Sequence, residues 1–287
     1  MANLASTYRN QGQWKEAEEL EVRVMETTKV LGEKHPATLT IRANLASTLI
    51  NQGRLEEAED IFVQVMKSSL KVHGKEHQDT LMIENNLATI YIKQNRHQEA
   101  EKLLLSVKET NIKLLGERHP DTLTTISNLA TGYMNQKRWK EAEELQLSLT
   151  KSFQTVLGER HPNTLSSMTN LASTYINQGR YKDAEKLSVE VIETMKIVLG
   201  EEHPDTLQSI SNLASMFGKQ ERWKEAEKLE VQVMETRERV LGEGHPDTLT
   251  SMANLALTFK NQGRLKQTSD LMKEWRRRWE TNNCIDV

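Results

Sequence analysis

The chain lacks several features that would narrow its function. Its 287 residues include one cysteine, Cys284, so the sequence offers no disulfide framework. No run of about 18 apolar residues is present, which argues against a membrane-spanning helix. The 38 basic and 41 acidic residues leave a net charge of −3, without the basic excess of nucleic-acid-binding domains. We therefore expect a cytoplasmic protein with neither nucleic-acid nor membrane partners.

Proline is also scarce, and its placement is regular. The five prolines all occupy one position of a repeated segment, namely Pro36, Pro120, Pro162, Pro204 and Pro246. A sixth copy of the segment carries Gln78 at that position. Six glycines recur at intervals of 42 residues, namely Gly32, Gly74, Gly116, Gly158, Gly200 and Gly242. A fixed period of this length is typical of a solenoid, in which each repeat buries its apolar face only against its neighbours.

Each repeat predicts two helices. Residues 204–220 place Leu207 and Ile210 on one helical face, and the proline at the start suits a first helical turn. Residues 223–241 carry a second apolar stripe and end before Gly242, which suits the left-handed residue that follows a helix. We therefore predict an all-α chain of antiparallel helix pairs joined by short turns.

The turn inside a repeat reads Asn-Gln-Gly-Arg in three copies. Asn95, Lys137 and Glu221 replace the glycine in three others. Asparagine tolerates a left-handed backbone nearly as glycine does, whereas lysine and glutamate do not. The turns at Lys137 and Glu221 are therefore either strained by roughly 1 kcal/mol or differently shaped.

Alanines recur on both helices of the repeat. The first helices carry Ala5, Ala46, Ala88, Ala130, Ala172, Ala214 and Ala256, and the second helices carry Ala17, Ala58, Ala100, Ala142, Ala184 and Ala226. Small residues that face each other let helices approach to the short end of the usual 8–10 Å or so. We expect both rows to be buried in the contacts between helices.

The residue order resembles the tetratricopeptide repeat. One copy runs Leu171-Ala172-x-x-Tyr175, then Gly179, Tyr181 and Ala184-Glu185. The HEAT repeat has a similar length but lacks this order. The 42-residue period and the phrase Leu-Gly-x-x-His-Pro-x-Thr-Leu resemble the kinesin-light-chain type, which is also similar to C-terminal arrays of NB-ARC-type (STAND) signalling proteins. The resemblance implies a right-handed α-solenoid of seven antiparallel helix pairs over residues 1–281, with its first helix truncated, and a C-terminal tail over residues 282–287.

Six histidines suggest a metal site at first sight, but their spacing argues against one. They are His35, His77, His119, His161, His203 and His245. Zinc ligands lie about 2 Å from one ion, whereas equivalent atoms of adjacent repeats are separated by about a helix-packing distance of 8–10 Å. We interpret these histidines as part of each helix start and expect neither metal nor cofactor.

Other chemically suggestive residues have simpler interpretations. Glutamates such as Glu16 and Glu19 lie at helix-surface spacing near Lys15, as on a solvated face. Neither a phosphate loop, a nucleophile elbow nor a Cys–His pair is present, so we expect no catalysis.

Trp275 and Trp279 flank three arginines, a combination that binds nucleic acid or acidic lipid in some proteins. Without a wider basic face, we favour a polar capping helix.

A row of asparagines is the best candidate for a binding site. Its members lie on the first helices at Asn3, Asn44, Asn86, Asn128, Asn170, Asn212 and Asn254. Asparagine is mildly unfavourable inside a helix, so a complete row needs a reason. The family resemblance implies that these first helices line a concave groove, in which the residue at this position grips the backbone of an extended peptide. The alternative is that the amides satisfy backbone groups or neighbouring helices.

Three hypotheses of function remain open from the sequence. The first is a non-catalytic scaffold that binds an extended peptide or partner segment in the groove through Asn44, Asn86, Asn128, Asn170, Asn212 and Asn254. The second is a ligand-sensing or autoinhibitory arm of a larger NB-ARC-type NTPase. The third is a structural array that self-associates, because the truncated first helix is expected to leave an apolar end uncovered.

Overall fold

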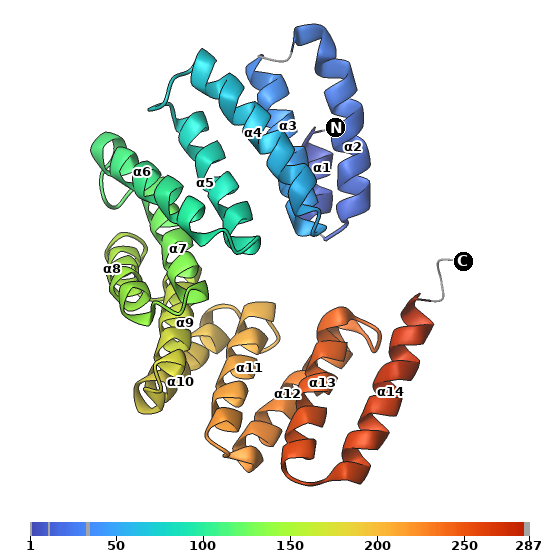
Figure 1. Cartoon of the computed structure of the whole chain (residues 1–287). Coiled ribbons are helices and arrows are strands. Elements are labelled where there is room, and N and C mark those ends of the chain that lie inside the picture. Colours follow the sequence, from blue (N-terminus) through green and yellow to red (C-terminus); the bar gives the residue numbers. More distant parts are fainter. Residues whose placement is uncertain (1, 11, 33–34, 284–287) are drawn as a thin grey trace. The chain divides into compact units, whose positions relative to one another are not determined.

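The computed structural model describes residues 2–10, 12–32 and 35–283, and all regular structure in these ranges is helical (Figure 1). The helices are α1 (Ala2–Asn10), α2 (Trp14–Thr28), α3 (Pro36–Asn51), α4 (Leu55–Val72), α5 (Gln78–Lys93), α6 (His97–Leu115), α7 (Pro120–Asn135), α8 (Trp139–Leu157), α9 (Pro162–Asn177), α10 (Tyr181–Val198), α11 (Pro204–Lys219), α12 (Trp223–Leu241), α13 (Pro246–Asn261) and α14 (Leu265–Asn283), with a 3-10 turn, η1 (Lys29–Leu31), after α2. The all-α prediction is confirmed.

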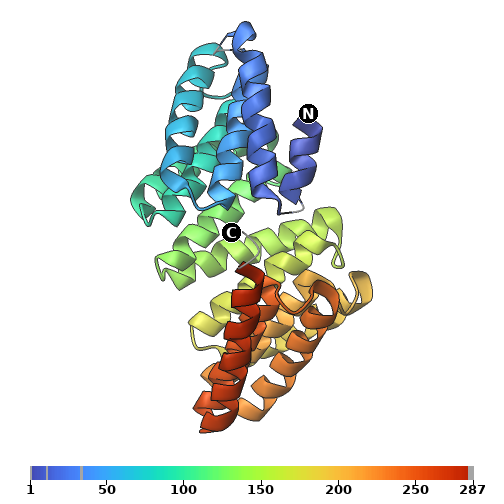
Figure 2. The same ribbon diagram turned by 90° about the vertical axis from the view of Figure 1, so that its right-hand side faces the viewer.

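The helices form two compact units, Met1–Leu145 and Gln146–Val287, whose boundary falls inside α8. Within each unit, consecutive helices pack against each other, as α13 and α14 do in Figure 2. First helices of adjacent repeats also contact directly, α5 with α3 and α7 in the first unit and α9 with α11 in the second. The odd-numbered helices therefore form a closely spaced layer in each unit, which we call the first-helix face.

The repeated glycine and histidine build the start of each first helix. The Nδ1 atom of His119 accepts a hydrogen bond from the N–H of Asp121 at 3.2 Å, and the hydroxyl of Thr122 donates to the carbonyl of Gly116 at 2.8 Å. The same histidine cap is found at His35, His77, His161, His203 and His245. The histidines are thus N-caps, as expected from their place in the repeat.

The backbone conformation of the repeated glycine differs from the one that we predicted. Gly116 and Gly242 have positive φ angles of 92° and 95°, but their ψ angles of 165° and 163° are extended. This is not the left-handed helical conformation that we predicted. It is the mirror-extended region, which only glycine enters readily, because the chain must leave the helix axis at once to reach the next N-cap.

The three turns without glycine keep the left-handed backbone and do not take a different shape. Asn95, Lys137 and Glu221 have φ angles of 61°, 59° and 60°. Glycines at the equivalent positions, such as Gly53 and Gly179, have φ angles of 81° and 77°. The turn geometry is therefore kept in every described repeat, and Lys137 and Glu221 carry the cost of a left-handed backbone.

Both alanine rows lie in the core, as predicted. On the second helices, Ala17, Ala58, Ala142, Ala184 and Ala226 have no exposed surface and Ala100 is 2% exposed. On the first helices, Ala5, Ala46, Ala88, Ala130, Ala172, Ala214 and Ala256 are all buried. Larger side chains fill the spaces beside them, and Phe62 and Leu104 are fully buried.

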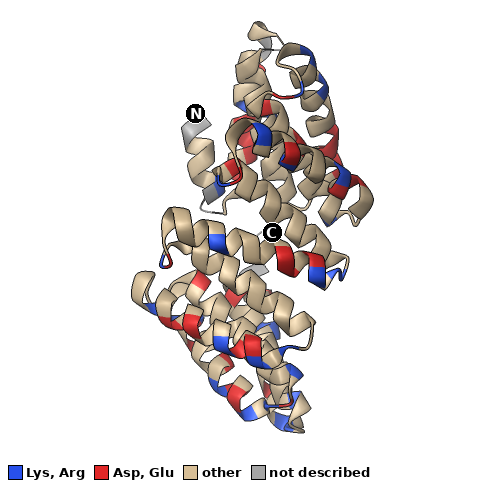
Figure 3. Cartoon of the chain, turned by 90° about the vertical axis from the view of Figure 1, so that its left-hand side faces the viewer, with Lys and Arg blue, Asp and Glu red and all other residues tan. Residues whose placement is uncertain are grey.

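From the second repeat on, an arginine that ends the inter-helix turn ties adjacent repeats together. The guanidinium of Arg138 lies 4.1 Å from the centre of the Tyr133 ring. It donates to Glu141 at 2.9 Å and to Glu101, on the preceding repeat, at 2.7 Å. Arg54, Arg96, Arg222 and Arg264 bridge in the same way to Glu18, Glu59, Glu185 and Glu227. In Figure 3, basic and acidic residues are interspersed along the helices.

Candidate functional site

The predicted asparagine row lies on the first-helix face. In the first unit, Asn44, Asn86 and Asn128 are partly exposed on α3, α5 and α7. In the second unit, Asn170 and Asn254 are exposed on α9 and α13, and Asn212 is partly exposed on α11. The side chain of Asn3 lies outside the described residues.

The amides of this row have few partners within the described chain. The Oδ1 atom of Asn212 accepts a hydrogen bond from Gln208 at 3.0 Å. Between residues 35 and 283, the other five amides of the row form no side-chain hydrogen bond within the chain, and they are Asn44, Asn86, Asn128, Asn170 and Asn254. Most of the row therefore presents an amide donor and an amide acceptor to the surroundings.

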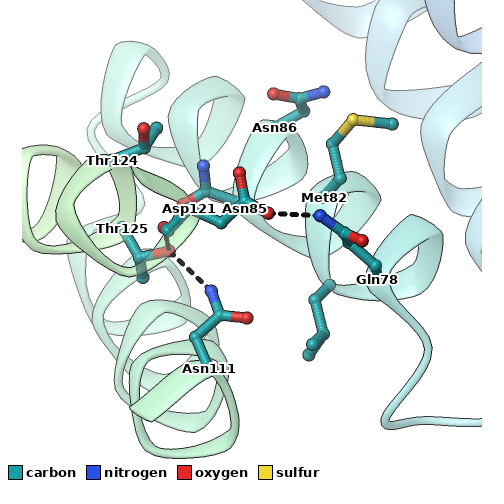
Figure 4. A pocket seen from close by; sticks show the side chains of 9 residues that line it. Gln78, Met82, Asn85, Asn86, Asn111, Asp121, Thr124 and Thr125 are labelled. Carbon is teal, nitrogen blue, oxygen red and sulfur yellow. Dashed lines mark hydrogen bonds between the residues drawn. The ribbon is translucent and has the colours of Figure 1, made fainter. Parts of the chain in front are cut away.

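Asn86 lies beside a pocket of about 120 Å³ in the first unit (Figure 4). The pocket is enclosed by α5, α6 and α7 and lined by Gln78, Leu81, Met82, Asn85, Asn86, Asn111, Asp121, Thr124 and Thr125. Gln78 is the residue that replaces the repeated proline. Because most of these side chains are polar, the pocket is suited to a hydrogen-bonding group.

Two hydrogen bonds join residues that line the pocket (Figure 4). Gln78 donates from Nε2 to the Asp121 carboxylate at 2.5 Å, and Asn111 donates from Nδ2 to the Thr125 hydroxyl at 3.3 Å. Asn85 and Asn111 are only 8% and 3% exposed, and the Oδ1 atom of each is buried without a hydrogen-bond donor from the chain. Buried polar atoms normally form hydrogen bonds, so these two oxygens are available to accept hydrogen bonds from a bound group.

A second pocket, of about 300 Å³, lies beside Asn254 in the second unit. It is lined by Ser211, Ala214, Ser215, Gly218, Lys219, Trp223, Glu230, Asn254, Leu257, Thr258 and Asn261. A Cβ on Gly218 would lie 3.4 Å from the Trp223 ring, so this glycine makes room for the indole. Burial raises the pKa of the Glu230 carboxyl, and a hydrogen bond from Thr258 opposes that shift.

The structure brings only part of the predicted row to these pockets. Asn86 and Asn254 line one pocket each, whereas Asn44, Asn128, Asn170 and Asn212 line neither. Sequence reasoning missed the polar residues behind the row, Asn85, Asn111 and Glu230. Their signal is departure from the repeat, since a 42-residue shift leads from Asn111 to Ser69 and Phe153 and from Glu230 to Ser188.

The C-terminal helix packs back onto its own unit. The indole N–H of Trp275 donates to the carbonyl of Leu249 at 3.1 Å, and Trp275 stacks on Trp279 with ring centres 6.4 Å apart. Arg278 is paired with Glu238 and Glu274. These contacts favour the capping interpretation of α14 over a nucleic-acid or lipid site, because the arginine and one indole face are engaged within the chain.

Metal and membrane chemistry find no support in the part of the chain that the structure describes. There, His, Cys, Asp and Glu form no group of three or more that could hold a metal ion. None of the described helices combines the length and apolarity needed to cross a membrane. Cys284 lies outside the described residues.

Comparison with known families identifies the repeat. One tetratricopeptide repeat model matches residues 1–71, 43–110, 79–133 and 121–197, and a second matches residues 206–247. The chain belongs to the tetratricopeptide repeat (TPR) family. No match was found among the curated proteins with which this TPR chain was compared.

Solved structures agree with the assignment. A variant of a kinesin-light-chain-like protein with nearly identical TPR-like repeats, from Podosopora anserina, is 31% identical over 68% of this TPR chain and 92% of its own length, with a TM-score of 0.59. A STAND protein with a TPR sensor from Pyrococcus horikoshii aligns with 99% of this chain and 42% of its own, at 13% identity and a TM-score of 0.65. NprR in complex with its cognate peptide NprX aligns with 94% and 78%, at 16% identity and a TM-score of 0.58. The last two similarities concern the fold alone.

Proposed function

We propose that this TPR array is a non-catalytic scaffold that binds an extended segment of a protein partner along the first-helix face. The observation that carries the proposal is the row of amides, one per repeat, most of which have no partner within the described chain. A side-chain amide donates and accepts at once, as a peptide group does. Amides repeated along adjacent helices can therefore hold a backbone whatever its side chains are.

The charge pattern supports recognition of the backbone rather than of a charged motif. The exposed residues Lys93, Lys219 and Lys260 lie in the last turns of α5, α11 and α13. The arginines of the inter-helix turns are already engaged by glutamates, as Arg138 is by Glu101. The contacts that the row itself makes with a partner should therefore depend little on salt.

The fold comparisons add support of a general kind. NprR, a structural neighbour, is described in complex with a peptide. The STAND neighbour carries its TPR region as a sensor, which keeps the alternative of a ligand-sensing or autoinhibitory arm. The two proposals differ in what binds, because a sensor arm would contact an NTPase domain of its own protein rather than a separate partner.

The proposal is tested with two triple variants, one for each unit. Partners captured from a cell lysate are identified and then titrated against the wild type, against Asn44→Ala/Asn86→Ala/Asn128→Ala, and against the corresponding variant of Asn170, Asn212 and Asn254. Each lost amide contact removes about 0.5–1.5 kcal/mol, so at least one triple variant should bind about tenfold more weakly or worse.

A matched control removes polar groups from the second helices. Gln98→Ala/Ser148→Ala changes exposed residues of α6 and α8 and should bind as the wild type does. If both triple variants remain folded and bind the partner with unchanged affinity, the first-helix face is not the binding surface. Binding of an NTPase domain in place of a separate partner would favour the sensor arm.

A further inference from the structure

One short side chain, that of Asn111, lines the pocket beside Asn86. Asn111 occupies the position that holds Phe153, Met195 and Arg237 in the following three repeats. Met195 and Arg237 extend from the second helix to the hydroxyls of Ser209 and Ser251 on the next first helix, as Asn111 does to the hydroxyl of Thr125. The repeats therefore show which groups this space accepts.

Arg237 shows how a guanidinium occupies the equivalent space in the second unit. It is 5% exposed and donates to the Ser251 hydroxyl at 2.8 Å, to the Asp247 carbonyl at 3.3 Å and to Gln208 Oε1 at 3.3 Å. Ser251 and Asp247 lie three 42-residue periods after Thr125 and Asp121, two residues that line the pocket. The walls of this space are thus compatible with a buried guanidinium.

The first-unit pocket offers acceptors in place of that arginine. The buried Oδ1 atoms of Asn85 and Asn111 have no donor from the chain, and the Asp121 carboxylate adds a negative charge at the rim. The volume of about 120 Å³ is several times the roughly 10–15 Å³ that a single water molecule needs in a cavity, so a group of several heavy atoms fits.

We propose that this pocket binds the guanidinium of an arginine side chain supplied by the partner segment. Asp121 accepts a charge-assisted hydrogen bond, and the amide oxygens of Asn85 and Asn111 accept two more. Arginine fits better than lysine, because its planar head presents five donors in fixed directions whereas an ammonium presents three from one atom. Asn86, at the same pocket, would hold the peptide backbone next to that arginine, and only this part rests on the proposed function.

The pocket is tested first with a small probe. N-acetyl-arginine amide is titrated into the 15N-labelled full chain, with the lysine and citrulline analogues as controls. We expect the side-chain amide signals of Asn85, Asn111 and Gln78 to shift with arginine, and citrulline, which is isosteric but uncharged, to bind about tenfold more weakly. Equal binding of citrulline or lysine, or shifts confined to other residues, would overturn the inference.

Filling the pocket provides the decisive variant. Asn111→Arg copies Arg237 and should abolish the arginine shifts without lowering the unfolding temperature. If it does not fold, Asn111→Met, which copies Met195, serves the same purpose. Probe binding that survives a folded filling variant excludes this pocket.

A short peptide with one central arginine tests whether the guanidinium comes from a protein segment or from a free compound. It should bind more tightly than the amino-acid amide, and Asn86→Ala should remove that gain; without any gain, a free arginine-like compound is the ligand and the partner-segment part is wrong. If the triple asparagine variant loses the protein partner while Asn111→Arg keeps full affinity for it, the scaffold function stands and the arginine pocket falls.

Discussion

The hydroxyl of Thr48 donates a 2.7 Å hydrogen bond to the buried carboxyl group of Glu21 on the preceding second helix. Thr174 and Gln146 form the same bond at 2.7 Å, and at the equivalent place Thr258 opposes the raised pKa of the Glu230 carboxyl. Where the second helix carries Phe62 or Leu104 instead, the facing position is Ile90 or Gly132. The longer polar residues Glu21, Gln146 and Glu230 thus each face a threonine, whereas the short Ser188 faces Met216.

Removing half of such a pair should destabilise the protein. Thr174→Val removes the hydroxyl that donates to the amide oxygen of Gln146, a residue only 2% exposed. We expect a loss of about 1–3 kcal/mol in the free energy of unfolding. Denaturant melts of Thr174→Val, Gln146→Leu and the double variant measure the coupling. Strictly additive effects would contradict the pairing.

The turn arginine should contribute to stability through its combined contacts. Arg138→Ala removes the contact with Tyr133 and both ion pairs, and because the side chain is about one-third exposed we expect a loss of about 1–2 kcal/mol. Arg138→Lys should recover only part of it, since lysine cannot bridge two carboxylates in the same plane. The loss should shrink in high salt. A lysine variant as stable as the wild type would show that charge alone matters.

The strained turn gives a prediction of the opposite sign. Lys137→Gly should stabilise the protein by roughly 1 kcal/mol, because glycine adopts the φ of 59° without a steric penalty. Lys151→Gly, at an exposed position in the interior of α8, is the control and should destabilise by about 1 kcal/mol. Thermal melts of both variants are compared, and destabilisation by both would mean that the turn is not strained.

Glu84 predicts a pH dependence. It is 6% exposed, and burial raises the pKa of its carboxyl, with Lys75 opposing the shift. Because the folded pKa lies above the unfolded one, stability is lost as pH rises from the usual carboxyl range through the raised value. Glu84→Met, which copies Met168 and Met252, should stabilise the protein at neutral pH by about 1–3 kcal/mol. The gain should vanish below the usual glutamate pKa, and a gain that does not change with pH would point to packing instead.

The fold could be predicted from repetition, but much of the site could not. The repeated phrase around Gly116 and His119 fixed the helix starts, and the alanine rows fixed the buried faces. Arg138 was missed because its partner, Glu101, lies 37 residues earlier and only the helix pairing brings them together. Asn111 was missed because a pocket depends on side-chain sizes on three helices at once, which one helical period does not express.

The matched threonine pairs also restrict how such a gene can change. Removal of a whole 42-residue segment would leave the helical phase of the chain intact. Loss of residues 48–89 would place Ile90 opposite Glu21, and loss of residues 90–131 would place Gly132 opposite Phe62. The first junction buries a carboxyl group against a hydrocarbon side chain, and the second sets a phenyl ring against a bare backbone. The repeats are therefore not interchangeable modules, because the residues that meet at each junction depend on the order of the repeats.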